Sequence, residues 1–192
     1  MLINKNIYFV HIPRTGGRFI RETLKINNHD VQNTEFGVLY REKETPHLTY
    51  PEYHQYLNYL PIKKFCVVRD PVDRFISMVT CTWFFNEQKI EHMFQSQNYF
   101  NETLNNFCIN HMSNFFVPQI NFVDYETNIW RFEDSLGENF IKWLFENFNL
   151  KIDTLPKKLN YKNPNQNKIN LNNRKIEYIK NYYYKDYKLF KY

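Results

Sequence analysis

The chain has 192 residues, a formal net charge of +5 and a sequence pI near 8.9. This length suits one hydrophobic core, so we expect a single domain over residues 1–192. The mild positive charge fits an acidic ligand or substrate, but it does not separate a nucleotide from a polyanion or a membrane surface. No apolar run is long enough to span a bilayer, and the first predicted strand begins close to Met1, which leaves no room for a signal peptide. We therefore expect a soluble, cytoplasmic protein without stable membrane insertion.

The cysteines exclude two further classes of protein. Cys66, Cys81 and Cys108 are odd in number and show no C-x-x-C spacing. This pattern indicates neither a disulfide framework nor a zinc site, so we expect a reducing compartment.

The first predicted unit is a strand, a loop with two glycines and a helix. Residues 7–12 mix β-branched and aromatic side chains and stop at Pro13, as a short buried strand does at a turn. The following FIRETL has its apolar residues at helical spacing. A helix N-terminus behind glycines attracts anions, because its first N–H groups lack partners and the helix dipole is positive there. Arg14 and Arg18 add two positive charges, so this loop favours phosphate or sulfate.

The loop also has a reading without a ligand. Many proteins contain a Gly-Gly turn beside an arginine that binds no ligand and serves only as a tight turn. The pattern G-x-x-x-x-G-K-[ST] is absent, because here a cation precedes the two glycines, and this disfavours a kinase of the P-loop class.

Two more predicted strands follow along the chain. Residues 47–57, HLTYPEYHQYL, predict a turn and a short helix, and KKFCVVRD (63–70) predicts a buried strand followed by a helix over residues 72–79. Residues 81–118 predict helices and loops. NIWRFED (128–134) predicts the third strand, with an amphipathic helix over 135–150, a loop over 157–173 and a terminal helix over 174–190. Alternating strands and helices predict an α/β fold with a central parallel sheet flanked by helices.

Arg69 and Ser77 predict a second anion pocket beside the first. Arg69 leaves the carboxyl end of a buried strand, the edge where open α/β sheets bind ligands, and Ser77 lies about two turns into the next helix. An arginine fork matches phosphate oxygens, and a serine adds a hydroxyl contact. The sequence therefore places two anion pockets on one sheet edge.

These two motifs resemble those of a known family. HIPRTGG (11–17) is similar to the 5′-phosphosulfate loop of sulfotransferases that use 3′-phosphoadenosine 5′-phosphosulfate (PAPS), and RDPVDRFIS (69–77) is similar to their 3′-phosphate motif. The most similar branch is that of carbohydrate sulfotransferases, which includes heparan sulfate 2-O-sulfotransferase and its bacterial relatives. HLTYPEY, PQINFVDY, WRFEDSL, LPKKLN and DYKLFKY match in order, so the likeness spans nearly the whole chain. It implies a P-loop-like three-layer fold, PAPS as co-substrate without a metal, and a glycan or small glycosylated acceptor rather than nucleic acid.

The resemblance also implies roles for individual residues. Arg14 takes the place of the family's lysine at the 5′-phosphate and the bridging oxygen. The backbone around that phosphate is expected to come from Thr15, Gly16 and Gly17, with Arg18 as an added cation. Arg69 and Ser77 are expected to hold the 3′-phosphate.

His47 is the candidate general base. It stands in TPHLTYPEY, where relatives carry a histidine ahead of a short helix, and an ordinary imidazole titrates near neutral pH. The alternative interpretation of His47 is a surface or capping histidine. Glu52 is the second candidate for the general base.

Other residues receive structural interpretations. Arg74 and Asp73 are expected to pair within the helix or across the loop, and Glu133 to anchor the third strand. His11 is expected to pack in the core or the loop, whereas His111 and Gln119 are candidates for the acceptor cleft.

Two departures from the family pattern support a second hypothesis. Arginine at position 14 stabilises a leaving oxygen but is a poor proton donor, and Arg18 and Phe19 stand where relatives have small hydroxyl residues. The alternative function is therefore a non-catalytic protein that binds a nucleotide or a polyanion on the same fold.

Overall fold

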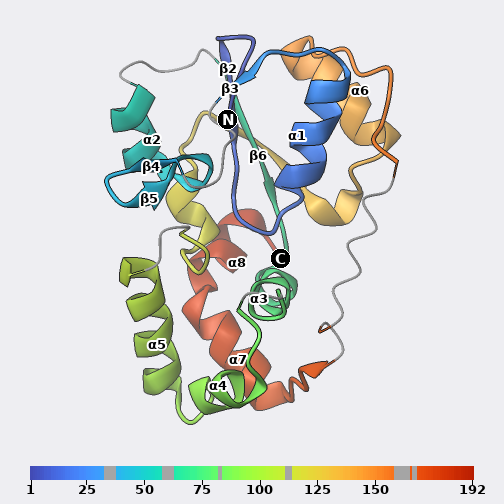
Figure 1. Ribbon diagram of the computed structural model, residues 1–192. Coiled ribbons are helices and arrows are strands. Elements are labelled where there is room, and N and C mark those ends of the chain that lie inside the picture. Colours follow the sequence, from blue (N-terminus) through green and yellow to red (C-terminus); the bar gives the residue numbers. More distant parts are fainter. Residues whose placement is uncertain (33–37, 58–62, 82–83, 111–113, 158–164, 166–167) are drawn as a thin grey trace.

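The computed structural model describes residues 1–32, 38–57, 63–81, 84–110, 114–157, 165 and 168–192, and its centre is a five-stranded sheet (Figure 1). The strands lie in the order β3-β1-β2-β6-β7. Their bounds are β1 Leu2–Ile3, β2 Ile7–Val10, β3 Val31–Gln32, β6 Lys63–Val68 and β7 Thr127–Arg131. The three longer strands β2, β6 and β7 are parallel, whereas β1 is antiparallel to both of its neighbours. A separate hairpin is formed by β4 Leu39–Tyr40 and β5 Lys43–Glu44.

Helices cover both faces of the sheet. They are α1 Gly17–Ile26, α2 Tyr50–Leu57, α3 Pro71–Val79, α4 Glu87–Met93, α5 Gln97–Asn110, α6 Glu138–Phe148, α7 Asn173–Tyr182 and α8 Tyr184–Phe190, with the short 3-10 helices η1 Thr45–His47, η2 Gln119–Phe122 and η3 Phe132–Asp134. In Figure 1, α1 and α6 lie on one side of β6 and α2 on the other. No described helix is both long enough and apolar enough to cross a membrane.

Alternation along the strands explains the layers. Phe9, Phe65 and Val67 face α1 and α6, where they join one buried cluster with Leu24 and Leu144. Their neighbours along the strands face the other way, and Tyr8, Val10, Cys66 and Val68 pack with residues of α2, η2 and α8. Successive strand side chains point to opposite faces, so each strand contributes to both clusters. The predicted α/β fold, with a sheet flanked by helices in three layers, is confirmed.

A third buried cluster lies among α3, α4, α5 and α7, at the lower end of Figure 1. It is rich in aromatic rings, and Phe75 of α3 packs against Phe100 of α5 with ring centroids 5.6 Å apart. This cluster fixes helix α3, which carries Ser77, against the rest of the molecule.

The elements differ from the sequence expectations in a few places. The strand predicted over residues 128–134 ends at Arg131, and the chain then turns into η3. The single terminal helix predicted over residues 174–190 is two helices, because the chain breaks at Tyr183. The two-residue strands β1, β3, β4 and β5 were not predicted, since such short segments show no periodicity.

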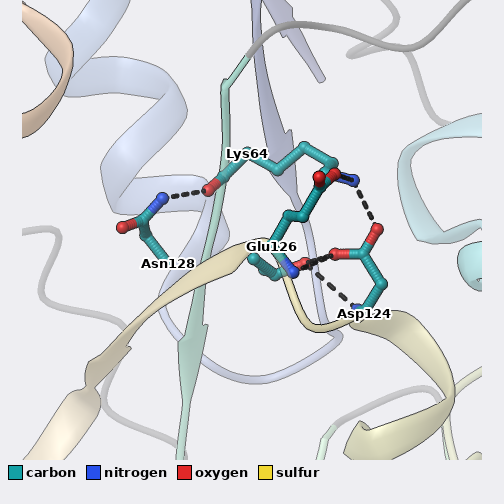
Figure 2. Close-up of polar contacts among 5 residues, drawn as sticks. Lys64, Asp124, Glu126 and Asn128 are labelled. Carbon is teal, nitrogen blue, oxygen red and sulfur yellow. Dashed lines mark hydrogen bonds and ion pairs between the residues drawn. The ribbon is translucent and has the colours of Figure 1, made fainter.

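A buried ion pair joins β6 to the start of β7 (Figure 2). The Lys64 ammonium group, with 2% of its side chain exposed, donates to the Asp124 carboxylate and lies 3.4 Å from that of Glu126. The Asn128 side chain donates to the backbone carbonyl of Lys64 at 3.1 Å. Burial alone would lower the pKa of Lys64, but the hydrogen bond and charge of Asp124 outweigh it and raise that pKa. The pair therefore stays ionised.

We predict that Lys64→Met lowers the free energy of unfolding by about 3 kcal/mol, because it leaves the Asp124 carboxylate buried without its cation. Urea denaturation at neutral pH measures the change. The control is Lys142→Met, whose side chain is 75% exposed and whose effect should stay within about 0.5 kcal/mol. Equal midpoints for the two variants would contradict the prediction.

Candidate functional site

Parallel pairing brings two loops to one edge of the sheet. Val10 pairs with Cys66, so the loop that follows β2 and the loop that follows β6 leave the sheet side by side. The first loop turns sharply, with left-handed backbone at Arg14 (φ 69°) and Gly16 (φ 90°), before α1 begins at Gly17. The Thr15 hydroxyl donates to the Ile12 carbonyl at 2.8 Å and thereby closes the turn. The expected order of strand, glycine loop and helix is confirmed.

The paired glycines are required by the protein's own packing. A Cβ on Gly17 would stand 1.9 Å from Nε2 of His11, so only a hydrogen atom fits there. A Cβ on Gly16 would stand 2.6 Å from Leu136 Cδ1 and 3.2 Å from the Phe132 ring. The positive φ of Gly16 independently favours glycine. The loop can therefore approach neighbouring groups very closely on both sides.

Arg14, Ser77 and Arg69 meet at this edge. Nε of Arg14 donates to the Ser77 hydroxyl at 3.0 Å, and Nη1 of Arg69 lies 3.5 Å from the Arg14 carbonyl oxygen. Burial, and then the positive charges of Arg69 and Arg18, lower the pKa of Arg14. Arg18 itself is exposed on the first turn of α1. Cations that repel one another beside a helix N-terminus are stabilised by an anion between them.

Arg69 is held in place through its backbone. The Gln119 side chain accepts from the Arg69 N–H at 3.0 Å and donates to the Arg69 carbonyl at 2.8 Å. The Arg69 guanidinium lies over the Phe132 ring, 4.7 Å from its centroid, and its buried Nε has no hydrogen-bond partner among the described residues. Gln119 is 0% exposed, so the expectation that it lines an acceptor cleft is wrong and it positions Arg69 instead. His111, the other candidate for that cleft, lies outside the described residues.

The loop after β6 is anchored on its other side by η3. Asp70 caps α3, with its carboxylate accepting from the N–H groups of Val72 and Asp73. The Asp70 N–H donates to Glu133 at 2.8 Å, and Glu133 also accepts from the Tyr192 hydroxyl at 3.0 Å. The structural interpretation of Glu133 as an anchor is confirmed.

Arg74 is buried and joins two loops through contacts that sequence reasoning did not identify. Its side chain donates to the carbonyl oxygens of Pro13, Val117 and Phe115 at 3.0, 3.1 and 2.8 Å. Arg74 thus pairs across the loop, one of the two arrangements expected for it, and its partners are backbone carbonyls. Sequence reasoning favoured a structural role for Arg74, which is 1% exposed, but it could not identify the three carbonyls that accept from its side chain.

His47 lies behind the first loop. It ends η1, is 3% exposed, and has its Nδ1 3.3 Å from a carboxylate oxygen of Glu44. Burial lowers the pKa of His47 below its usual 6.5, although Glu44 opposes the shift. The His47 ring is therefore neutral at neutral pH, the form that can accept a proton.

Glu52, the second candidate for the general base, is held by hydrogen bonds to neighbouring residues. One of its oxygens accepts from the N–H and hydroxyl of Thr49 at 2.6 and 2.7 Å, which is a helix capping arrangement, and also from Asn114 at 2.8 Å. Asn114 in turn donates to the His47 carbonyl at 3.0 Å. Glu52 thus caps α2 and helps to place His47. No group of three or more metal-ligating side chains gathers among the described residues.

We predict that Gly17→Ala lowers the free energy of unfolding by about 1–3 kcal/mol even without a ligand, because the new methyl group must displace the His11 ring. Thermal unfolding measures this loss. The matched control is Gly137→Ala, where the nearest atom to the new Cβ, Ser135 Oγ, is 3.4 Å away and the expected cost is below about 1 kcal/mol. A Gly17→Ala protein as stable as the control would mean that the His11 ring yields freely.

Comparison with known proteins places this edge of the sheet in a family. Residues 3–81 match a family model described as "Sulfotransferase family". Neither the curated proteins nor the solved structures gave a match. The matched segment contains β2, β6, both loops and α3, and the family supports sulfotransfer as the general activity. The match over residues 3–81 therefore confirms the resemblance inferred from the two motifs.

Proposed function

We propose that this chain transfers a sulfuryl group from PAPS to a hydroxyl of a carbohydrate or a small glycosylated acceptor. The observation that carries the proposal is the meeting of Arg14, Arg69 and Ser77 at the carboxyl ends of β2 and β6, beside the N-terminus of α1. This arrangement supplies both charge and directed donors for two phosphate groups of one donor molecule.

The donor's two phosphates divide between the two loops. The 5′-phosphosulfate lies against the backbone N–H groups of Thr15, Gly16 and Gly17, with Arg14 beside the bridging oxygen. The 3′-phosphate is bound by Arg69 and Ser77. Support comes from the Arg69 Nε, a buried donor without a partner among the described residues, and from the Ser77 hydroxyl, which accepts from Arg14 and can still donate its own proton.

Transfer then needs a base and a way to stabilise the leaving group. The acceptor oxygen attacks sulfur, the bond from sulfur to the bridging phosphate oxygen breaks, and the acceptor proton passes to His47. Arg14 stabilises the negative charge that develops on the departing 3′-phosphoadenosine 5′-phosphate (PAP), without giving up a proton. Glu44, 3.3 Å from His47 Nδ1, stabilises the imidazolium that forms.

A second candidate function is favoured by one observation. His47 is 3% exposed, whereas a base must reach the acceptor hydroxyl. A protein that only binds a nucleotide or a polyanion needs no exposed base. Binding and turnover measurements together separate the two functions.

Our binding prediction concerns the 3′-phosphate. Titration calorimetry should show that PAP binds more tightly than AMP or ATP, and that Arg69→Met weakens PAP binding by about 10- to 100-fold, as for loss of a charged hydrogen bond. The control Arg21→Met removes a charge that pairs with Glu22 on α1, and it should change PAP affinity by less than about threefold. Equal affinity for PAP and AMP would contradict the assignment of PAPS as the donor.

Our turnover prediction concerns His47. Transfer of radiolabelled sulfate from PAPS to heparosan or to 4-nitrophenyl glycosides should fall by about 10²- to 10⁴-fold in His47→Ala. Because the pKa of His47 lies below 6.5, the base form persists at neutral pH, and the wild-type rate should decline only as pH falls below that value. A wild type that binds PAP but transfers nothing supports the second candidate, and an unchanged rate in His47→Ala removes His47 from the mechanism.

A further inference from the structure

His11 lies between the phosphate loop and His47, where the sequence suggested only packing. It follows the last residue of β2, and its Nε2–Cδ2 edge faces Gly17 at the start of α1. Its ring meets the His47 ring edge to face, with centroids 4.6 Å apart. Contacts therefore run without a gap from Gly17 in the loop through His11 to the proposed base, His47. Glu44 lies beyond His47.

The His11 ring is packed tightly against Gly17. Nε2 and Cδ2 of His11 lie 1.9 and 2.0 Å from the position that a Cβ on Gly17 would take. The ring is also stacked on Phe9, with ring centroids 5.7 Å apart. Close-packed groups move together, so a shift of the Gly17 backbone displaces the His11 ring toward or away from His47.

An imidazole at this position is not explained by packing. His11 is 8% exposed, and its buried Nδ1 has no hydrogen-bond partner among the described residues. Buried polar atoms are nearly always hydrogen-bonded, and a phenyl ring would fill the same space without leaving an orphaned nitrogen. The polar atom therefore indicates a role in the site beyond core burial.

Burial and the positive charges around it keep the His11 ring neutral. Burial is the main cause that lowers its pKa well below 6.5, and the groups that add to it are His47 of η1, the amino group of Met1, and Arg21 and Arg18 of α1. A neutral ring can approach the neutral ring of His47 without repulsion.

We propose that His11 is a positioning residue that couples the occupancy of the phosphate loop to the placement of His47. The inference rests on the proposed function and deepens it. A phosphate drawn to the N–H groups of the loop shifts the Gly17 backbone. The His11 ring follows because it is packed against Gly17, and its contact with the His47 ring sets where that ring lies. The base is thereby placed for reaction only when the donor is present.

The first test reads the coupling without turnover. Ring ¹³C–¹H spectra of the histidines are recorded with and without PAP. In the wild type, PAP should shift both the His11 and His47 signals, while that of His54, exposed on α2, stays in place. In His11→Asn, PAP should still bind within about threefold of the wild-type affinity, yet the His47 signal should no longer move.

The second test is a double-mutant cycle on transfer to the same glycosides. His11→Asn should lower kcat by about tenfold or more with little change in the KM for PAPS. Added to His47→Ala it should cause no further loss, because it acts through His47. The matched control His54→Asn makes the same chemical change on an exposed helix face and should leave kcat unchanged.

The outcomes separate the two claims. A wild type that does not bind PAP overturns the donor assignment and the coupling with it. A wild type that binds PAP and transfers sulfate, but whose His47 signal shifts equally in His11→Asn or whose losses are additive, overturns the coupling alone. Thermal unfolding checks each variant, and His11→Gln replaces His11→Asn if the latter does not fold.

Discussion

The site depends on one buried side chain, the guanidinium of Arg74. It donates to the carbonyls of Pro13, Phe115 and Val117, so a single residue of α3 fixes the loop after β2 and the segment before η2. Ser77 stands three residues further along the same helix and therefore on the same face. Once Arg74 has fixed Pro13, the next residue, Arg14, is brought within hydrogen-bond distance of Ser77. Burying a charged group is costly unless it is hydrogen-bonded, and here each of the three guanidinium nitrogens donates to a carbonyl.

The part of the chain beyond the family match supports the part within it. Asp186 of α8 is 0% exposed and accepts from the N–H groups of Gln119 and Ile120, which fixes η2. Gln119 then brackets the backbone of Arg69 on both sides. Residues 3–81 thus supply the side chains that face the proposed donor, whereas residues from η2 onward hold them in position.

Sequence reasoning succeeded where chemistry is local and failed where it depends on partners far along the chain. The three longer strands, the glycine loop and the helix behind it follow from apolar periodicity and turn residues, which act between near neighbours. Gln119 and Arg74 could not be assigned in this way, because their partners lie 50 residues away for the first and 41 to 61 for the second. The glycines are the instructive case. The sequence predicted that a ligand approaches them closely, and in the structure the side chains of His11 and Leu136 lie close to them.

In the proposed mechanism, Arg14 and His47 divide the chemistry between them. An arginine whose pKa is lowered only by burial and by neighbouring cations stays charged at any working pH, so Arg14 supplies charge and no proton. The neutral His47, on the other side of His11, can take a proton but carries no charge to stabilise a leaving oxygen. Neither group can replace the other. The 3.0 Å bond from Nε of Arg14 to Ser77 uses one donor of Arg14 and leaves the Ser77 hydroxyl proton for a phosphate oxygen. In the proposed complex, the phosphates of the donor would relieve the repulsion between Arg14, Arg69 and Arg18, which favours binding of an anion there.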